Sequence, residues 1–449
     1  MAFLAGAGRA DITPPVGIMQ SGYAARTSPA VGVHDELTAT ALYLEVDGVA
    51  VGIVALDWID VENGEVPLIR ACCEKLAGIP GTHVLLAASH THGGPEIGPE
   101  EGNPLRTSYA EAVRWQIAGA LAEARHRAVP ARLGHARQEA RVAGNRRQRG
   151  PDGRVFIGYN PDGLTPCTTD VLRFDSAESG HPLAVVYTYG CHGTTLRHDN
   201  LWITADYPGL ARRFVERQLP GTRALFLRTP GADQNPHPRG SFELAQRHGT
   251  ALGAAVLQGV LEAGETRAVE RLATATLTCS LPLAALPSVA ACRAELEAAE
   301  AAAEEERRQS RVGAAGPAFD PTIPLSWAAN RRVEAARERL AAALRGEGDL
   351  SIPVALQAIA LDEVGLVSLP AEVFFAIGEE IRSRSPFRVS LPVDHANGAI
   401  GYIPTQAEVP FGGYEVEESR AARHGLFIRD DADAALIDGA LAALGKVGH

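Results

Sequence analysis

Short apolar runs alternate with segments of helical periodicity over about the first 280 residues of the chain. This alternation favours a mixed α/β architecture over a helical bundle or a β-sandwich. The runs Ala41–Val46 and Val49–Ala55 flank the turn dipeptide Asp47-Gly48, so they predict a β-hairpin. Further runs are short, rich in residues that favour strands, and bounded by Gly or Pro. They predict buried sheet strands at Val84–Ala88, Leu183–Tyr189, Ala224–Leu227 and Val364–Leu369.

Two later segments have a strongly helical composition. Ser288–Arg311 is dense in Ala, Glu and Arg, Trp327–Arg345 is similar, and the residues between them are rich in Gly and Pro. We expect a helical hairpin over residues 288–346, inserted into the α/β body. A coiled coil is disfavoured because Leu296 is almost the only large apolar residue in the first helix. Asp430–Leu444 predicts a closing helix. The fold class we predict is mixed α/β, with central mixed β-sheets sandwiched by helices.

Composition narrows the classes of function. The chain has 449 residues, 46% of them hydrophobic, which is enough to bury a sizeable core. The formal charge of −12 argues against a nucleic-acid binder, because phosphate recognition needs a basic face. No uncharged apolar stretch approaches the length of a membrane span, and the N-terminus lacks the pattern of a secretion signal. We therefore expect a soluble cytoplasmic protein. Its oligomeric state is not predicted by the sequence.

Histidines follow two of the predicted strands. Open α/β sheets bind ligands beyond the carboxyl ends of their strands, so residues at these positions are candidates for a site. His90 and His92 follow the run Val84–Ala88, and an extended segment would place both on one side. They could share a metal, or one could bind metal while the other meets substrate. His192 follows Leu183–Tyr189 in the same way.

Two neighbouring residues have alternative interpretations. Cys191 is a possible ligand by type, but adjacent strand residues face opposite sides, which favours a buried, small apolar role. Glu372 follows the strand Val364–Leu369 and could supply the carboxylate that a zinc site with two imidazoles usually includes. Its alternative role is a favourable charge in the first turn of the following helix.

A set of short motifs resembles the catalytic domain of the neutral/alkaline non-lysosomal ceramidases. The motifs recur in that family's order across nearly the whole chain, so the resemblance implies that residues 1–449 form a single ceramidase-like catalytic domain. They are Gly6–Pro14, Gly32–Ala39, Ser89–Pro95, Cys191–Thr195, Asp206–Gly209, Gly231–Pro236, Leu369–Glu372 and Gly401–Thr405.

The resemblance implies a metal site. In that family, two histidines, a glutamate and a tyrosine hold a zinc ion, and the enzyme cleaves the N-acyl amide of ceramide. The matching positions here are His90, His192, Glu372 and Tyr402, so Zn²⁺ is the expected cofactor. A tyrosine ligand makes physical sense only beside the metal, and Tyr402 would otherwise be an aromatic residue of a strand or rim.

The resemblance also implies residues that meet the substrate. His92 matches the second, substrate-facing histidine of the family's His-Thr-His pair. Arg146, within Asn145-Arg146-Arg147, is similar to the arginine of the family's Asn-Arg-Ser segment, although it could equally be one more exposed arginine of an Arg-rich run. Tyr414 matches a second active-site tyrosine.

The chain departs from the family in two respects. Where ceramidases carry Asp-Val-Ser-Pro, with a serine implicated in catalysis, this chain has Asp233-Gln234-Asn235-Pro236. The amide of Asn235 cannot replace a nucleophilic hydroxyl. The resemblance covers only the catalytic domain, so we expect no counterpart of the family's C-terminal immunoglobulin-like domain. We expect both departures to alter substrate specificity before they alter the hydrolytic reaction.

These observations predict a zinc-dependent hydrolase that cleaves a carboxamide or related acyl bond of a small molecule by metal-activated water. His92 would assist proton transfer or stabilise the oxyanion, Arg146 and Tyr414 would orient substrate, and Asn235 could donate to the oxyanion. One alternative is a true ceramidase or N-acyl-lipid amidase, which predicts an apolar groove beside the metal. Another is a ligand-binding relative without turnover.

Overall fold

An eight-stranded mixed sheet forms the centre of the computed structural model, which describes residues 3–98, 100, 102–312, 325–346, 350–417 and 426–448. β12 is parallel to β10 and β5 is parallel to β4, whereas the other neighbours are antiparallel. The strands in spatial order are β12 (Arg223–Arg228), β10 (Pro182–Tyr189), β9 (Thr168–Ser176), β6 (Val129–Glu139), β1 (Leu4–Asp11), β3 (Thr38–Val46), β4 (Val49–Leu56) and β5 (Val84–Ala88).

The predicted hairpin is β3 and β4. Val46 pairs with Val49 across the turn, and Asp47 and Gly48 both have positive φ, of 52° and 82°. Two consecutive positive φ values are the backbone of a type I′ turn, which matches the twist of the flanking strands. The other predicted strands are also confirmed, each within two residues of its expected bounds.

A second sheet lies against the first. It contains β14 (Leu272–Pro282), β15 (Ser351–Leu361), β16 (Val364–Leu369) and β18 (Val389–Asp394) in that order. Leu172 and Leu225 of the first sheet belong to the same buried cluster as Ile359 and Leu391 of the second. The two sheets therefore share one apolar layer.

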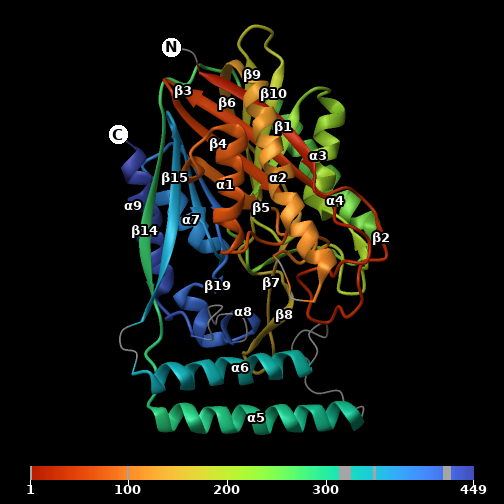
Figure 1. Cartoon of the computed structure of the whole chain (residues 1–449), viewed down its shortest axis with the longest axis vertical. Coiled ribbons are helices and arrows are strands. Elements are labelled where there is room, and N and C mark those ends of the chain that lie inside the picture. The colour runs from red at the N-terminus through yellow and green to blue at the C-terminus, as the bar shows by residue number, and fades with distance from the viewer. Residues whose placement is uncertain are drawn as a thin grey trace.

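Helices cover the outer faces of both sheets (Figure 1). The larger sheet carries α1 (Glu65–Ala77), α2 (Pro104–His126), α3 (Asp206–Gln218) and α4 (Phe242–Glu262), and the smaller sheet carries α7 (Phe375–Arg384) and α9 (Ala432–Val447). Alternation along β10 explains the layers, because Tyr187 packs with α3 and α4 while Val186 packs toward the second sheet. The predicted α/β fold with helices outside mixed sheets is confirmed. No helix among the described residues is long and apolar enough to cross a membrane.

The predicted helical hairpin consists of α5 (Val289–Val312) and α6 (Leu325–Leu344). In the sequence, both helices lie between β14 and β15, and these two strands pair with each other along their whole length. Leu296 and Ala303 of α5 pack against Val333 of α6, and Arg339 pairs with Glu295. Figure 1 shows the two helices side by side at one end of the molecule. Most of the predicted Gly/Pro linker, residues 313–324, lies outside the described residues.

Short elements gather at the carboxyl ends of the strands. They are β2 (Gly32–Val33), β7 (Ala143–Arg149), β8 (Val155–Asn160), β11 (Trp202–Ile203), β13 (Gln234–Pro236), β17 (Glu372–Val373), β19 (Tyr402–Ile403) and α8 (Tyr414–Glu417). Isolated bridges join the segments that follow the strands, since Thr91 after β5 pairs with Gly193 after β10 and Ala396 after β18 pairs with Ala87. These contacts bring residues from distant parts of the sequence to one place.

Candidate metal centre

His90 lies just beyond β5, where the chain turns sharply. β5 ends at Ala88 and His90 has a φ of 60°, so the expectation of one extended segment through His92 is wrong. The two rings nevertheless come together, with centroids 4.9 Å apart. His90 Nδ1 lies 2.7 Å from the carbonyl oxygen of Ile59, so this nitrogen carries the ring proton and Nε2 offers its lone pair.

His192 follows β10 and is completely buried. Its Nδ1 lies 2.9 Å from the carbonyl oxygen of Gln234. Its Nε2 lies 3.1 Å from Nη1 of Arg146, and because a guanidinium can only donate, Nε2 carries the lone pair. Both histidines therefore have the tautomer that suits a metal ligand, fixed in each case by a backbone carbonyl. Cys191 is buried in the apolar cluster beneath α3 and α4, as the strand alternation predicts.

Glu372 and Tyr402 face this centre from a pair of two-residue strands. They are direct partners in the parallel register of β17 and β19. The alternative of a charge in a helix first turn is excluded, because α7 begins only at Phe375. Tyr402 is buried, and its hydroxyl lies 3.5 Å from His192 Nε2. The side chain of Glu372 is only 20% exposed, and its Oε2 is buried without a hydrogen-bond partner among the described residues.

The spacing of these donor atoms fits a small metal ion. Glu372 Oε2 lies 3.4 Å from His90 Nε2 and 3.5 Å from His192 Nε2. A tetrahedral zinc site with bonds of roughly 2.0–2.1 Å separates its ligand atoms by roughly 3.3–3.4 Å. Nitrogen and oxygen donors also suit zinc, iron and manganese. The four residues could therefore hold such an ion, and the buried, unpartnered carboxylate oxygen of Glu372 supports this fit.

His92 lies beside the centre and in contact with the cavity. Its Nε2 is 3.4 Å from Nε2 of His90, and one ring nitrogen from each of His90, His92 and His192 lies within 4.8 Å of the other two. Burial, the neighbouring His90 and three arginines hold the pKa of His92 well below its usual value. His92 is therefore neutral at neutral pH, with one nitrogen able to donate and the other able to accept a proton.

Arg146 is buried, so it is not an exposed member of an Arg-rich run. Its Nε donates to Glu415 at 2.8 Å and its Nη2 donates to the hydroxyl of Tyr402 at 3.1 Å. Burial opposes the charge, but Tyr402 and Glu415 outweigh it and raise the pKa of Arg146 above its ordinary value. Its third contact, with His192 Nε2, uses the lone pair that a metal ligand would need, so a bound metal would replace that hydrogen bond.

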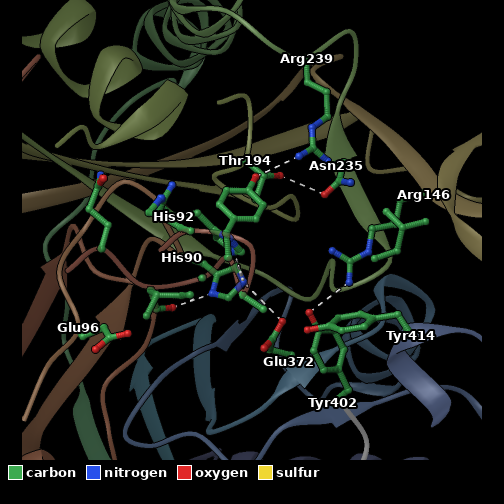
Figure 2. Close-up of a pocket in the computed structure, with 17 residues that line it drawn as sticks. His90, His92, Glu96, Arg146, Thr194, Asn235, Arg239, Glu372, Tyr402 and Tyr414 are labelled. Carbon is green, nitrogen blue, oxygen red and sulfur yellow. Dashed lines mark hydrogen bonds and ion pairs between the residues drawn. The ribbon is translucent and has the colours of Figure 1, made fainter. Parts of the chain in front are cut away.

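The remaining predicted residues lie around the same cavity, which has a volume of about 470 Å³ (Figure 2). Tyr414 packs edge-on against Tyr402, with ring centroids 5.7 Å apart. Asn235 is buried on β13, and its Oδ1 accepts a hydrogen bond of 3.0 Å from Thr194. His192 lies behind the wall, and the other seven predicted residues line the cavity: His90, His92, Arg146, Asn235, Glu372, Tyr402 and Tyr414.

Sequence reasoning missed several buried residues beneath the site. The His395 ring stacks on His90 with centroids 3.8 Å apart, and neither of its buried nitrogens has a hydrogen-bond partner in the part of the chain that the structure describes. Asp394 pairs with Arg228, whose Nη2 lies 3.3 Å from His192 Nδ1. Asp394 and His395 come at the end of β18, so the rule that ligand sites follow strands could have found them.

Comparison with known proteins identifies the fold. No family model and no curated protein matches the sequence. The structure is similar to the crystal structure of neutral ceramidase from Pseudomonas aeruginosa, with a TM-score of 0.71 and 20% identity over 100% of this chain and 75% of that chain. It is also similar to a structure of a ceramidase complexed with C2, with a TM-score of 0.73 and 18% identity over 100% of this chain and 76% of that chain. The chain therefore has the fold of the neutral ceramidases along its whole length.

Proposed function

We propose that this protein is a zinc-dependent hydrolase that cleaves a carboxamide or related acyl bond of a small molecule. The proposal depends above all on one observation, the convergence of His90 Nε2, His192 Nε2 and the unpartnered Glu372 Oε2 at separations of 3.4 and 3.5 Å. The hydroxyl of Tyr402 would be the fourth donor. A zinc ion held there would polarise the substrate carbonyl and lower the pKa of water.

The residues around the proposed ion have separate tasks. The backbone carbonyls of Ile59 and Gln234 orient the two imidazoles, so the donor atoms are in place before anything binds. His92 is neutral and its Nε2 lies 3.4 Å from Nε2 of His90, beside the proposed ion, so this imidazole can accept a proton from water or give one to the leaving group. Arg146 is held in position by Glu415. With the His192 lone pair given to a bound metal, Nη1 of Arg146 would be free to donate to the developing oxyanion.

Asn235 and Tyr414 complete the contacts with substrate. The Asn235 side chain receives a hydrogen bond at Oδ1, which leaves its amide nitrogen as a donor toward the carbonyl oxygen. Tyr414 supplies a ring that bounds the cavity next to Tyr402. Since Asn235 offers no hydroxyl, attack by water without an acyl-enzyme is the mechanism we favour.

The lining of the cavity favours a short or polar acyl substrate over ceramide. Among the described residues that line it, the aliphatic ones are Ala24, Ile59 and Ile157, and the others are polar, aromatic or glycine. A long lipid chain would need a more continuous apolar groove. A true ceramidase is therefore the second candidate, supported by the shared fold but not by this lining.

Metal analysis combined with a substrate panel tests the proposal. The purified protein should contain about one zinc per chain and should hydrolyse members of a panel of short N-acyl amides and esters. Removal of the metal by a chelator should abolish turnover, and zinc should restore it. A zinc-loaded protein that binds acyl compounds but hydrolyses none of the panel would instead be a ligand-binding relative.

A further inference from the structure

Two arginines line the proposed cavity without a carboxylate partner among the residues that the structure describes. Arg26 is 6% exposed, and its Nη1 donates to the carbonyl oxygens of Ser21 and His92, both at 2.9 Å. Its Nε and Nη2 are buried without hydrogen-bond partners. Arg239 is partly buried, its Nη2 donates to the hydroxyl of Tyr23 at 3.0 Å, and its Nε has no partner. Figure 2 shows Arg239 across the cavity from Glu372 and Tyr402.

The other buried arginines among the described residues each pair with a carboxylate. Arg146, Arg212 and Arg228 each hold a carboxylate, contributed by Glu415, Asp57 and Asp394. Within the described part of the chain, neither Arg26 nor Arg239 forms an ion pair. Buried guanidinium groups normally require such partners, because removing an unpaired charge from water is costly.

The carboxylates nearest the cavity do not neutralise this pair. Glu96 pairs with Arg106 at 2.8 Å, and Glu372 belongs to the proposed metal site. Asp199 is exposed, and its effect on Arg26 is an electrostatic attraction that raises the pKa of the guanidinium. Burial lowers the pKa of Arg26 to about 10, so the group remains charged at neutral pH. The cavity wall beside His92 is therefore positively charged.

Arg239 also lies where two cavities meet. A second cavity of about 320 Å³ shares Ile157, Asn235 and Arg239 with the first, and Arg197 lines it as well. A substrate whose scissile bond lies at the proposed metal site could extend past Asn235 toward Arg239. Nη1 of Arg239 makes no hydrogen bond to any described residue, so it is available to such a ligand.

We propose that the substrate carries a carboxylate that binds to Arg239, with Arg26 adding its charge, so that the preferred substrates are N-acyl amino acids. This inference rests on the proposed function. Guanidinium and carboxylate groups match in charge and planar geometry. Hydrolysis of such a substrate breaks the C–N bond and forms a C–O bond from water. One proton passes to the leaving nitrogen, and the products are a carboxylic acid and a free amino acid.

A matched pair of substrates tests the inference with the zinc-loaded full chain. N-hexanoyl-leucine and N-hexanoyl-3-methylbutylamine differ only in the carboxylate. We expect kcat/KM to be about 10- to 100-fold higher for N-hexanoyl-leucine than for the neutral amide, mainly because its KM is lower. A factor of this size is typical of a hydrogen bond to a charged group. Arg239→Gln should remove this preference while leaving the neutral amide within about 3-fold of the native rate, and Arg239→Lys should restore part of it. Arg217→Gln removes an exposed positive charge outside the cavity and serves as the control.

Binding to the metal-free protein separates this inference from the proposed function. Calorimetry after chelation should detect N-hexanoyl-leucine binding that Arg239→Gln weakens by about 10-fold or more and Arg217→Gln does not. If neither compound is hydrolysed, the proposed function fails, while this binding still decides whether Arg239 selects a carboxylate. Equal kcat/KM for both compounds, or an equal loss for both in Arg239→Gln, would overturn the inference.

Discussion

Glu372 and Tyr402 are direct partners in the short parallel ladder formed by β17 and β19. Paired residues of adjacent strands project to the same face of a sheet, so this register presents a carboxylate and a phenol together. Both face the Nε2 of His192, at 3.5 Å in each case. Half of the proposed ligand set is thus positioned by a ladder of only two residue pairs.

Removing Glu372 should remove the metal together with the activity. Glu372→Ala deletes the carboxylate whose Oε2 faces both histidines, so we expect loss of most bound zinc and of detectable turnover. Metal content measured by mass spectrometry alongside kcat checks this expectation. The control variant Glu178→Ala, which changes an exposed glutamate distant in sequence from Glu372, should change neither quantity. Full zinc content in Glu372→Ala would exclude Glu372 as a ligand.

Ceramide should be a poor substrate. The small aliphatic lining of the cavity favours short N-acyl compounds, so kcat/KM for long-chain ceramide in mixed micelles should lie well below that for hexanoyl amides. The measurement is a direct comparison of both substrates with one zinc-loaded preparation. Efficient cleavage of ceramide with the short amides ignored would reverse the order of the two candidate functions.

Asn235 should help catalysis without forming a covalent bond. Asn235→Ala would remove one donor to the oxyanion, and we expect kcat to fall about 10- to 100-fold while zinc stays bound. Intact-mass analysis of quenched reactions should show only the unmodified chain. An acyl adduct on any Ser, Thr or Cys would contradict attack by water.

Asp170 should make stability depend on acid pH. Burial alone would raise its pKa, but a hydrogen bond from His135 and the charges of Arg382 and Arg137 lower it from 3.8 to about 2. A carboxylate with a lowered folded-state pKa stabilises the protein above its ordinary pKa, and that contribution is lost as pH falls toward 2. Asp170→Asn should therefore cost about 2 kcal/mol at neutral pH, and the cost should shrink by roughly half near pH 3. Urea unfolding of both proteins across this pH range provides the measurement, and a cost that does not vary with pH would contradict it.

The long elements were predictable because their patterns are local. The hairpin around Asp47-Gly48 depends on a turn dipeptide between two short apolar runs, and α5 and α6 depend on helix-forming composition. The stacking of the two sheets was harder to predict from the sequence, since it depends on which apolar faces pack against each other. β15 shows this well, because Ile359 packs toward the other sheet while Ala358 packs toward α9.

The site was predictable in its residue types but not in its geometry. The sequence motifs predicted which residues converge. They could not predict the positive φ of His90 or the pairing of Glu372 with Tyr402, because both depend on contacts between distant segments. Arg26 and Arg239 could not be found from sequence. Their importance comes from the absence of carboxylate partners among the described residues, which only a folded structure can reveal.

Anomalous X-ray scattering on crystals of the zinc-loaded protein is the most direct test of the proposed metal site. We expect one strong anomalous peak at the zinc edge, within about 2.0–2.2 Å of His90 Nε2, His192 Nε2 and Glu372 Oε2, with Tyr402 as the next nearest donor. The peak should be absent from a His90→Ala, His192→Ala double variant grown under the same conditions. A peak that persists in the double variant, or a stoichiometric zinc located elsewhere in the native protein, would contradict the account.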